Sequence, residues 1–204
     1  LTLHGFFIDL NPACPDPKIK EATIYRYNQA LKIARELKAQ TIVFHSGYNG
    51  LVKHPVYHSN FLKESINFWK EFIKQFEETG IMAVLENTYE NEPDIIIQII
   101  DNVASPNFKM CIDTGHVNIN SQYSVKEWIE KVGTRLHHMH LHNNSGYADE
   151  HRSIYNGTVD FNQVLDTLKN NNLNPDLVLE IFEKDAALES VDFIKNYEKN
   201  KVSN

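Results

Sequence analysis

The residues of this chain that could do chemistry are carboxylates and histidines placed in, or just after, short apolar runs. Glu86 directly follows one run and Asp113 directly follows another. Carboxylate oxygens and imidazole nitrogens are common ligands of divalent metal ions. A buried cluster of such groups is costly unless a cation compensates its charge. We therefore predict a metal-binding cluster that contains His4, His45, Glu86, Asp113, His140 and Glu180.

The apolar runs have the length and composition of strands in a buried parallel sheet. Because side chains alternate between the faces of a strand, Cys111 shares a face with Asp113, and Val178 shares one with Glu180. His138, His140 and His142 share another face in the same way. The predicted strands are Leu1–Leu10, Thr41–Phe44, Ile81–Leu85, Lys109–Ile112, Leu136–Leu141 and Leu177–Ile181.

Amphipathic segments with helical spacing separate these runs. Ser124 followed by Glu127 is a capping-box pattern, and Asp160 is a second candidate cap. The predicted helices are Lys18–Lys38, Asn60–Thr79, Glu92–Val103, Ser124–Val132, Phe161–Asn171 and Lys184–Tyr197. Alternation of strand and helix predicts parallel strands joined by right-handed crossovers, as in a barrel-like or doubly wound sheet. Ligands bind such folds at the carboxyl ends of the strands. No linker or repeat divides the chain, so we expect one domain over 1–204.

Composition narrows the classes of partner and compartment. The chain has 204 residues and a net charge of −7, which argues against a nucleic-acid partner but leaves room for a local basic patch. Its two cysteines, Cys14 and Cys111, are far apart and lack ligand spacing. We read them as reduced thiols and, with no signal peptide or apolar span in the sequence, predict a cytoplasmic protein with no membrane partner.

Simpler explanations apply to each polar residue taken alone. A single carboxylate at the end of a strand is more often a helix cap or a salt-bridge partner than a metal ligand. Such residues recur at six successive strands, however, and this favours a common site. Glycine-rich nucleotide loops, a nucleophile elbow and an HExxH helix are absent from the sequence.

Six segments together resemble the xylose-isomerase-like TIM barrel superfamily, and they cover nearly the whole chain. Each motif is weak alone, but their order and spacing make the likeness specific. The segments are His4–Leu10, Val43–Gly47, Val84–Thr88, Cys111–His116, His138–Asn143 and Val178–Glu180. The superfamily includes sugar and sugar-phosphate isomerases and epimerases, and also endonuclease IV. The resemblance implies a (β/α) TIM barrel.

The isomerase and epimerase branch implies one divalent metal ion held by Glu86, Asp113, His140 and Glu180. The two glutamates would also be catalytic and would move a proton through a metal-bound enediolate of a sugar or sugar phosphate. The ligand types suit Mn, Mg, Co or Zn, with one ion expected and up to three conceivable.

The endonuclease IV branch, a zinc-dependent phosphodiesterase acting on DNA, offers an alternative. Its nine ligands for three zinc ions have counterparts here, which add His4, His45, His116, Asp149 and His151 to the four above. Three features argue against that activity. The net charge is acidic, and the loop after Glu86 lacks the glycine-rich stretch of that branch. Phe7 also lies near the position where endonuclease IV has a tyrosine that helps to distort DNA. A third interpretation is a barrel that binds metal or sugar without catalysis.

One departure from the family concerns the beginning of the sequence. The chain starts at Leu1, and two strand–helix units that normally precede the strand matching Leu1–Leu10 are absent, so we expect about six of eight units. An open sheet edge at that strand would seek a partner, which predicts a homodimer.

Overall fold

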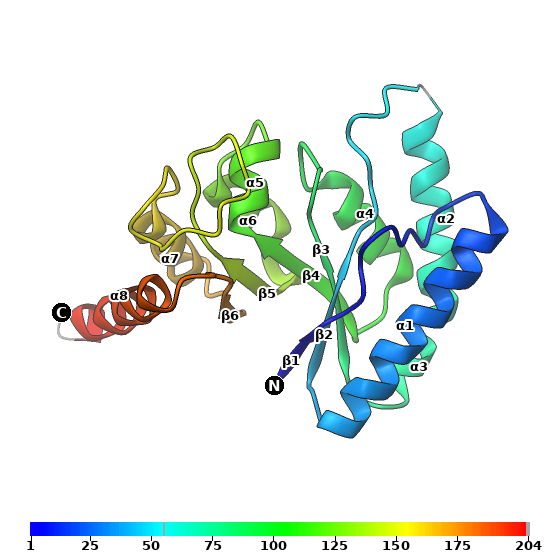
Figure 1. Cartoon of the computed structure of the whole chain (residues 1–204), viewed down its shortest axis with the longest axis horizontal. Coiled ribbons are helices and arrows are strands. Elements are labelled where there is room, and N and C mark those ends of the chain that lie inside the picture. The colour runs from blue at the N-terminus through cyan, green and yellow to red at the C-terminus, as the bar shows by residue number, and fades with distance from the viewer. Residues whose placement is uncertain (55, 203–204) are drawn as a thin grey trace. The chain divides into compact units, whose positions relative to one another are not determined.

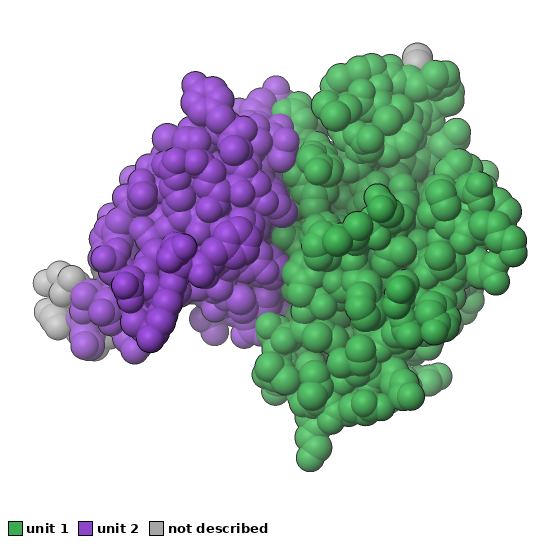
Figure 2. Space-filling model, in the orientation of Figure 1, with its two compact units in different colours: residues 1–111 green, residues 112–204 purple. Residues whose placement is uncertain are grey.

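The structure is a computed structural model that describes residues 1–54 and 56–202. The chain forms two compact units, Leu1–Cys111 and Ile112–Asn204 (Figure 2). Along the described residues, strands β1 to β6 alternate with helices, as the sequence predicts (Figure 1). No helix in this described part is long and apolar enough to span a bilayer.

Parallel strands form the centre of the first unit. β1 pairs with β2, β2 with β3, and β3 with β4, each time in parallel register. The register places His45 directly opposite Glu86. β2 and β3 are rich in buried apolar residues such as Val43 and Val84, as expected for strands covered on both faces. The strands are β1 (Thr2–His4), β2 (Thr41–His45), β3 (Met82–Glu86) and β4 (Phe108–Asp113), the last of which ends in the second unit.

Helices and aromatic packing hold this sheet in place. α1 starts with the Asp16 side chain accepting the Lys18 N–H at 2.8 Å. α1 and α2 lie next to each other, joined by an ion pair between Lys20 and Glu64 at 2.9 Å (Figure 1). Trp69 of α2 is fully buried and stacks on the Phe108 ring, which packs α2 against β4. The helices are α1 (Pro17–Leu37), α2 (Tyr57–Phe72), α3 (Lys74–Glu77) and α4 (Asp94–Val103).

The second unit contains two parallel strands, in which His140 lies opposite Val178. The predicted capping box at the start of α6 is present, with the Ser124 N–H donating to Glu127 at 2.8 Å. Asp160 caps α7 through the Gln163 N–H, also as predicted. The elements are β5 (Leu136–Leu141), β6 (Asp176–Leu179), α5 (Thr114–Asn120), α6 (Val125–Val132), η1 (Gly133–Arg135), α7 (Phe161–Asn170) and α8 (Lys184–Val202).

Two predicted elements differ in extent from the structure, and one observed helix was not predicted. The first strand ends at His4 rather than Leu10, because the chain turns away and Asp9 adopts a left-handed conformation with φ of 58°. The predicted helix Asn60–Thr79 is interrupted at Ile73. The short helix α5, for which Asp113 is the N-cap, was not predicted because it offers only seven residues of pattern.

Candidate metal centre

The first unit brings together three of the predicted site residues at the ends of β1, β2 and β3. Nε2 of His4 lies 3.3 Å from Glu86 Oε2, and Nε2 of His45 lies 3.4 Å from the same oxygen. The Glu86 side chain is only 1% exposed, so its carboxylate is nearly removed from water. We call His4, His45 and Glu86 the first cluster.

The chemistry of the first cluster fits a divalent metal ion. Each of its three residues offers a ligand atom, and these atoms lie within 4.8 Å of one another. Two imidazole nitrogens and a carboxylate oxygen form a donor set that zinc and related ions take in proteins. The Phe7 ring packs against the His45 ring with centroids 4.5 Å apart and so limits how the imidazole can turn.

A buried glutamate that the sequence reasoning missed supports the first cluster. Oε2 of Glu90 accepts the Thr88 N–H at 2.6 Å, and Oε1 accepts the Ser46 hydroxyl. The Ser46 N–H in turn donates to the Glu86 carbonyl at 3.1 Å. Glu90 therefore ties the segment after β2 to the segment after β3. An acidic residue four positions after Glu86 gave no pattern that marked it as buried.

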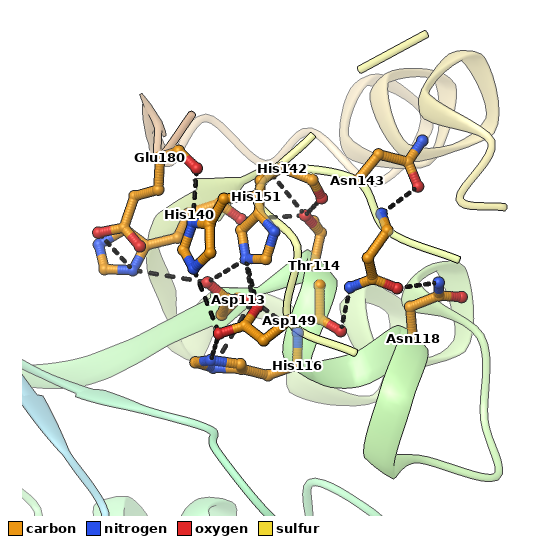
Figure 3. A network of polar contacts seen from close by, with 12 residues as sticks. Asp113, Thr114, His116, Asn118, His140, His142, Asn143, Asp149, His151 and Glu180 are labelled. Carbon is orange, nitrogen blue, oxygen red and sulfur yellow. Dashed lines mark hydrogen bonds and ion pairs between the residues drawn. The ribbon is translucent and has the colours of Figure 1, made fainter. Parts of the chain in front are cut away.

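The second unit brings together Asp113, His140 and Glu180 (Figure 3). Nδ1 of His140 lies 3.4 Å from Glu180 Oε1 and 3.8 Å from Asp113 Oδ2. Asp113 is fully buried, and its Oδ1 accepts the His116 N–H at 2.7 Å, which caps α5. Glu180 lies just beyond β6, and its N–H donates to the Leu141 carbonyl at 3.2 Å.

Asp149 connects two further predicted ligands in the second unit. Its Oδ2 lies 3.5 Å from His116 Nε2 and 3.2 Å from His151 Nε2 (Figure 3). The second nitrogen of His151 donates to the Glu180 carbonyl at 2.7 Å. His151 holds a left-handed backbone conformation with φ of 48°, which is uncommon for a residue other than glycine and often marks functional sites.

Burial and hydrogen bonding have opposite effects on the pKa values of Asp149 and His151. Burial would raise the pKa of Asp149, but hydrogen bonds from His116 and His151 outweigh it and hold the pKa well below its usual range. The hydrogen bond to Asp149 raises the pKa of His151 against the opposing effect of burial. Proton and metal ion therefore compete for the same nitrogen of His151.

His142 is a site residue that the sequence reasoning did not select. Its Nε2 lies 3.0 Å from Asp113 Oδ1 and 3.7 Å from Asp149 Oδ1. Ligand atoms of His142, Asp149 and His151 lie within 4.8 Å of one another. The signal was available in the sequence, because His142 alternates with His140 and shares its face.

The nine predicted residues are divided between the two compact units. The first unit holds the first cluster. The second cluster, in the second unit, consists of Asp113, His116, His140, Asp149, His151 and Glu180, with His142 added. Within each unit, carboxylates and imidazoles come close enough to act as ligands, which is the arrangement that a divalent metal ion requires.

Comparison with known sequences shows the family to which the chain belongs. The sequence profile described as the xylose isomerase-like TIM barrel matches residues 1–197. The chain belongs to this family, and the predicted fold class and superfamily are confirmed.

Individual relatives extend the comparison. The uncharacterised protein MJ1311 of Methanocaldococcus jannaschii is 30% identical over 97% of this chain, which spans 69% of that protein. A solved structure titled as a D-tagatose 3-epimerase-like protein is 28% identical, with a TM-score of 0.87 over 100% of this chain and 79% of its own. The TTHB071 protein from Thermus thermophilus, soaked with ZnCl2, is 22% identical, with a TM-score of 0.81 over 98% of this chain and 78% of its own.

Proposed function

We propose that this protein is a divalent-metal-dependent isomerase or epimerase of sugars or sugar phosphates. The observation that carries the proposal is the contact of His140 with both Glu180 and Asp113, three of the four predicted ligands. The 28% identity to a D-tagatose 3-epimerase-like protein over the whole chain supports the same chemistry.

In this proposal, Glu86, Asp113, His140 and Glu180 bind the metal ion. The ion would supply a positive charge that polarises the substrate carbonyl and stabilises negative charge as a proton leaves the neighbouring carbon. The burial of Glu86 keeps water away from its carboxylate, and Glu180 is 28% exposed on its side chain, which leaves room for a substrate.

Proton transfer is the task proposed for the two glutamates. One carboxylate takes the proton from the carbon beside the carbonyl, and the other returns a proton at the neighbouring atom or on the other face. His140 lies 3.4 Å from Glu180 and limits the orientations of that carboxylate.

Replacing Glu180 by glutamine tests this role. We expect Glu180→Gln to lower kcat for sugar isomerisation by about 10²–10⁴-fold, because the amide cannot accept a proton. Glu183→Gln is a matched control, since Glu183 lies on the surface three residues further along. Exchange of substrate hydrogen with deuterated water reports the proton step directly. Turnover that survives in Glu180→Gln would contradict the proposal.

The number of metal ions separates the leading function from its alternative. Metal content per chain, measured by inductively coupled plasma mass spectrometry after purification without chelator or tag, is expected to be one Mn, Mg, Co or Zn. Two or three zinc ions would favour a phosphodiesterase, and no metal would favour a barrel that binds without catalysis.

The phosphodiesterase alternative has one observation in its favour, which is the surplus of ligands. His4, His45, His116, Asp149 and His151 exceed what one ion needs, and each lies beside a carboxylate or imidazole. Alanine at His45 or His151 would abolish hydrolysis of a nicked or abasic DNA but leave an isomerase partly active.

Two further expectations remain predictions. The homodimer would be recognised by light scattering, and a monomer would contradict it. The cytoplasmic compartment rests on the sequence and is tested by cell fractionation.

A further inference from the structure

His142 has no part in the proposed proton transfer, yet its ring is held on several sides. The side chain is fully buried at the end of β5. The Thr114 hydroxyl donates to its carbonyl at 2.9 Å, which ties the backbone of His142 to the start of α5. His142 is therefore a buried, fixed histidine that lies between predicted metal ligands.

The hydrogen bonds of His142 point to Asp113. Its Nε2 lies 3.0 Å from Oδ1 and 3.2 Å from Oδ2 of that carboxylate (Figure 3). Its Nδ1 is buried and has no hydrogen-bond partner among the described residues. The proton therefore belongs on Nε2, where Asp113 can accept it.

This bond sets the direction of the Asp113 carboxylate. Oδ1 accepts both the His116 N–H at 2.7 Å and Nε2 of His142 at 3.0 Å. Nε2 of His142 also lies 3.2 Å from Oδ2, and Oδ2 in turn lies 3.8 Å from Nδ1 of His140. His140 is the ligand with which Asp113 is proposed to share the ion.

The ring of His142 also positions His151. The two imidazoles are stacked with centroids 4.0 Å apart and planes at 10°. Gly115 lies against the His142 ring so closely that a Cβ at position 115 would overlap the imidazole. His142 therefore has little freedom to move, and it passes this restraint to the ring it stacks on.

We propose that His142 is a positioning residue that orients Asp113 by hydrogen bonding and His151 by stacking, so that both present their ligand atoms to metal. The inference rests on the proposed metal binding of the second cluster, but not on the identity of the substrate. Hydrogen-bond partners that orient metal ligands commonly contribute about 10–100-fold to metal affinity.

Two substitutions separate hydrogen bonding from packing. His142→Phe keeps a stacked ring but loses the donor, whereas His142→Gln keeps an N–H donor near the position of Nε2 but loses the ring. We expect His142→Phe to weaken the affinity for zinc or manganese by about 10–100-fold, and His142→Gln to recover part of that loss. His58→Phe, on the exposed surface of α2, is the matched control.

Affinity is measured by isothermal titration of the metal-free protein, and thermal unfolding is recorded with chelator present. Weaker metal binding by His142→Phe, with partial recovery in His142→Gln, supports the inference even if metal-free stability also changes. Unchanged affinity overturns it and leaves His142 with a packing role. The clean loss of one whole ion, with the remaining affinity intact, also overturns it, because His142 would then be a ligand itself.

The same titration distinguishes this inference from the proposed function. Metal binding by the unaltered protein without isomerase activity would sink the function alone. An unaltered protein that binds no metal would overturn both.

Discussion

Two nitrogens of His151 contact acceptors, and this decides its charge in the metal-free protein. Nδ1 lies 2.7 Å from the Glu180 carbonyl and Nε2 lies 3.2 Å from the Asp149 carboxylate. A neutral imidazole carries one N–H, so both bonds can form only when the ring is protonated. The raised pKa of His151 reflects its hydrogen bond to Asp149, and the lowered pKa of Asp149 reflects hydrogen bonds from both His116 and His151.

This ion pair predicts a pH dependence of stability in the metal-free protein. The raised pKa of His151 stabilises the fold below about pH 6.5, and this is lost as pH rises through the folded value. The lowered pKa of Asp149 stabilises it above about pH 3.9 and is lost in stronger acid. Asp149→Asn should therefore lower the free energy of unfolding most near pH 5.5 and less near pH 9. Thermal unfolding with chelator across this range measures the difference, and a cost that does not change with pH would contradict the pairing.

Gly115 offers a second prediction about single residues. A methyl group at this position would overlap the His142 ring, so we expect Gly115→Ala to lower the free energy of unfolding by about 1–3 kcal/mol and to weaken metal binding. Gly80→Ala is an informative control, because nothing lies within 4 Å of a Cβ there while its φ of 71° still strains alanine. Both variants should lose stability in urea unfolding, but only Gly115→Ala should lose metal affinity.

At the scale of helices and strands, β5 was predicted correctly from the sequence, whereas the first strand was not. β5 occupies the predicted range Leu136–Leu141, a short run that contains Leu136, Met139 and Leu141. The alternation of side chains along the strand predicts the face on which His142 lies. It does not predict that His142 contacts Asp113, since this contact depends on how α5 and β5 pack. The predicted first strand is too long because Phe6, Phe7 and Ile8 continue its apolar run in the sequence. In the structure these residues follow the turn and are exposed.

The capping box of α6 yields a prediction at this scale. The Ser124 side chain accepts the Glu127 N–H at 3.3 Å, and the Glu127 carboxylate accepts the Ser124 N–H at 2.8 Å. Ser124→Ala should lower the free energy of unfolding by about 1 kcal/mol, because an N–H of the first turn loses its acceptor. Ser59→Ala, an exposed serine in α2, should cost less than about 0.5 kcal/mol. Equal effects in urea unfolding would contradict the capping role.

At the scale of the whole molecule, metal binding is coupled to folding, because an ion that binds only the folded chain stabilises it.

Thermal unfolding in the presence of metal measures this coupling. A metal ion at 100 times its dissociation constant adds about 2.7 kcal/mol, which for a chain of this size raises Tm by about 5–11 °C. We expect Glu86→Gln and His140→Asn each to remove most of that rise, because the proposed function takes both residues as metal ligands. His58→Asn, exposed on α2, should keep the full rise. A rise that survives in Glu86→Gln but not in His140→Asn would contradict the proposed role of Glu86 as a ligand.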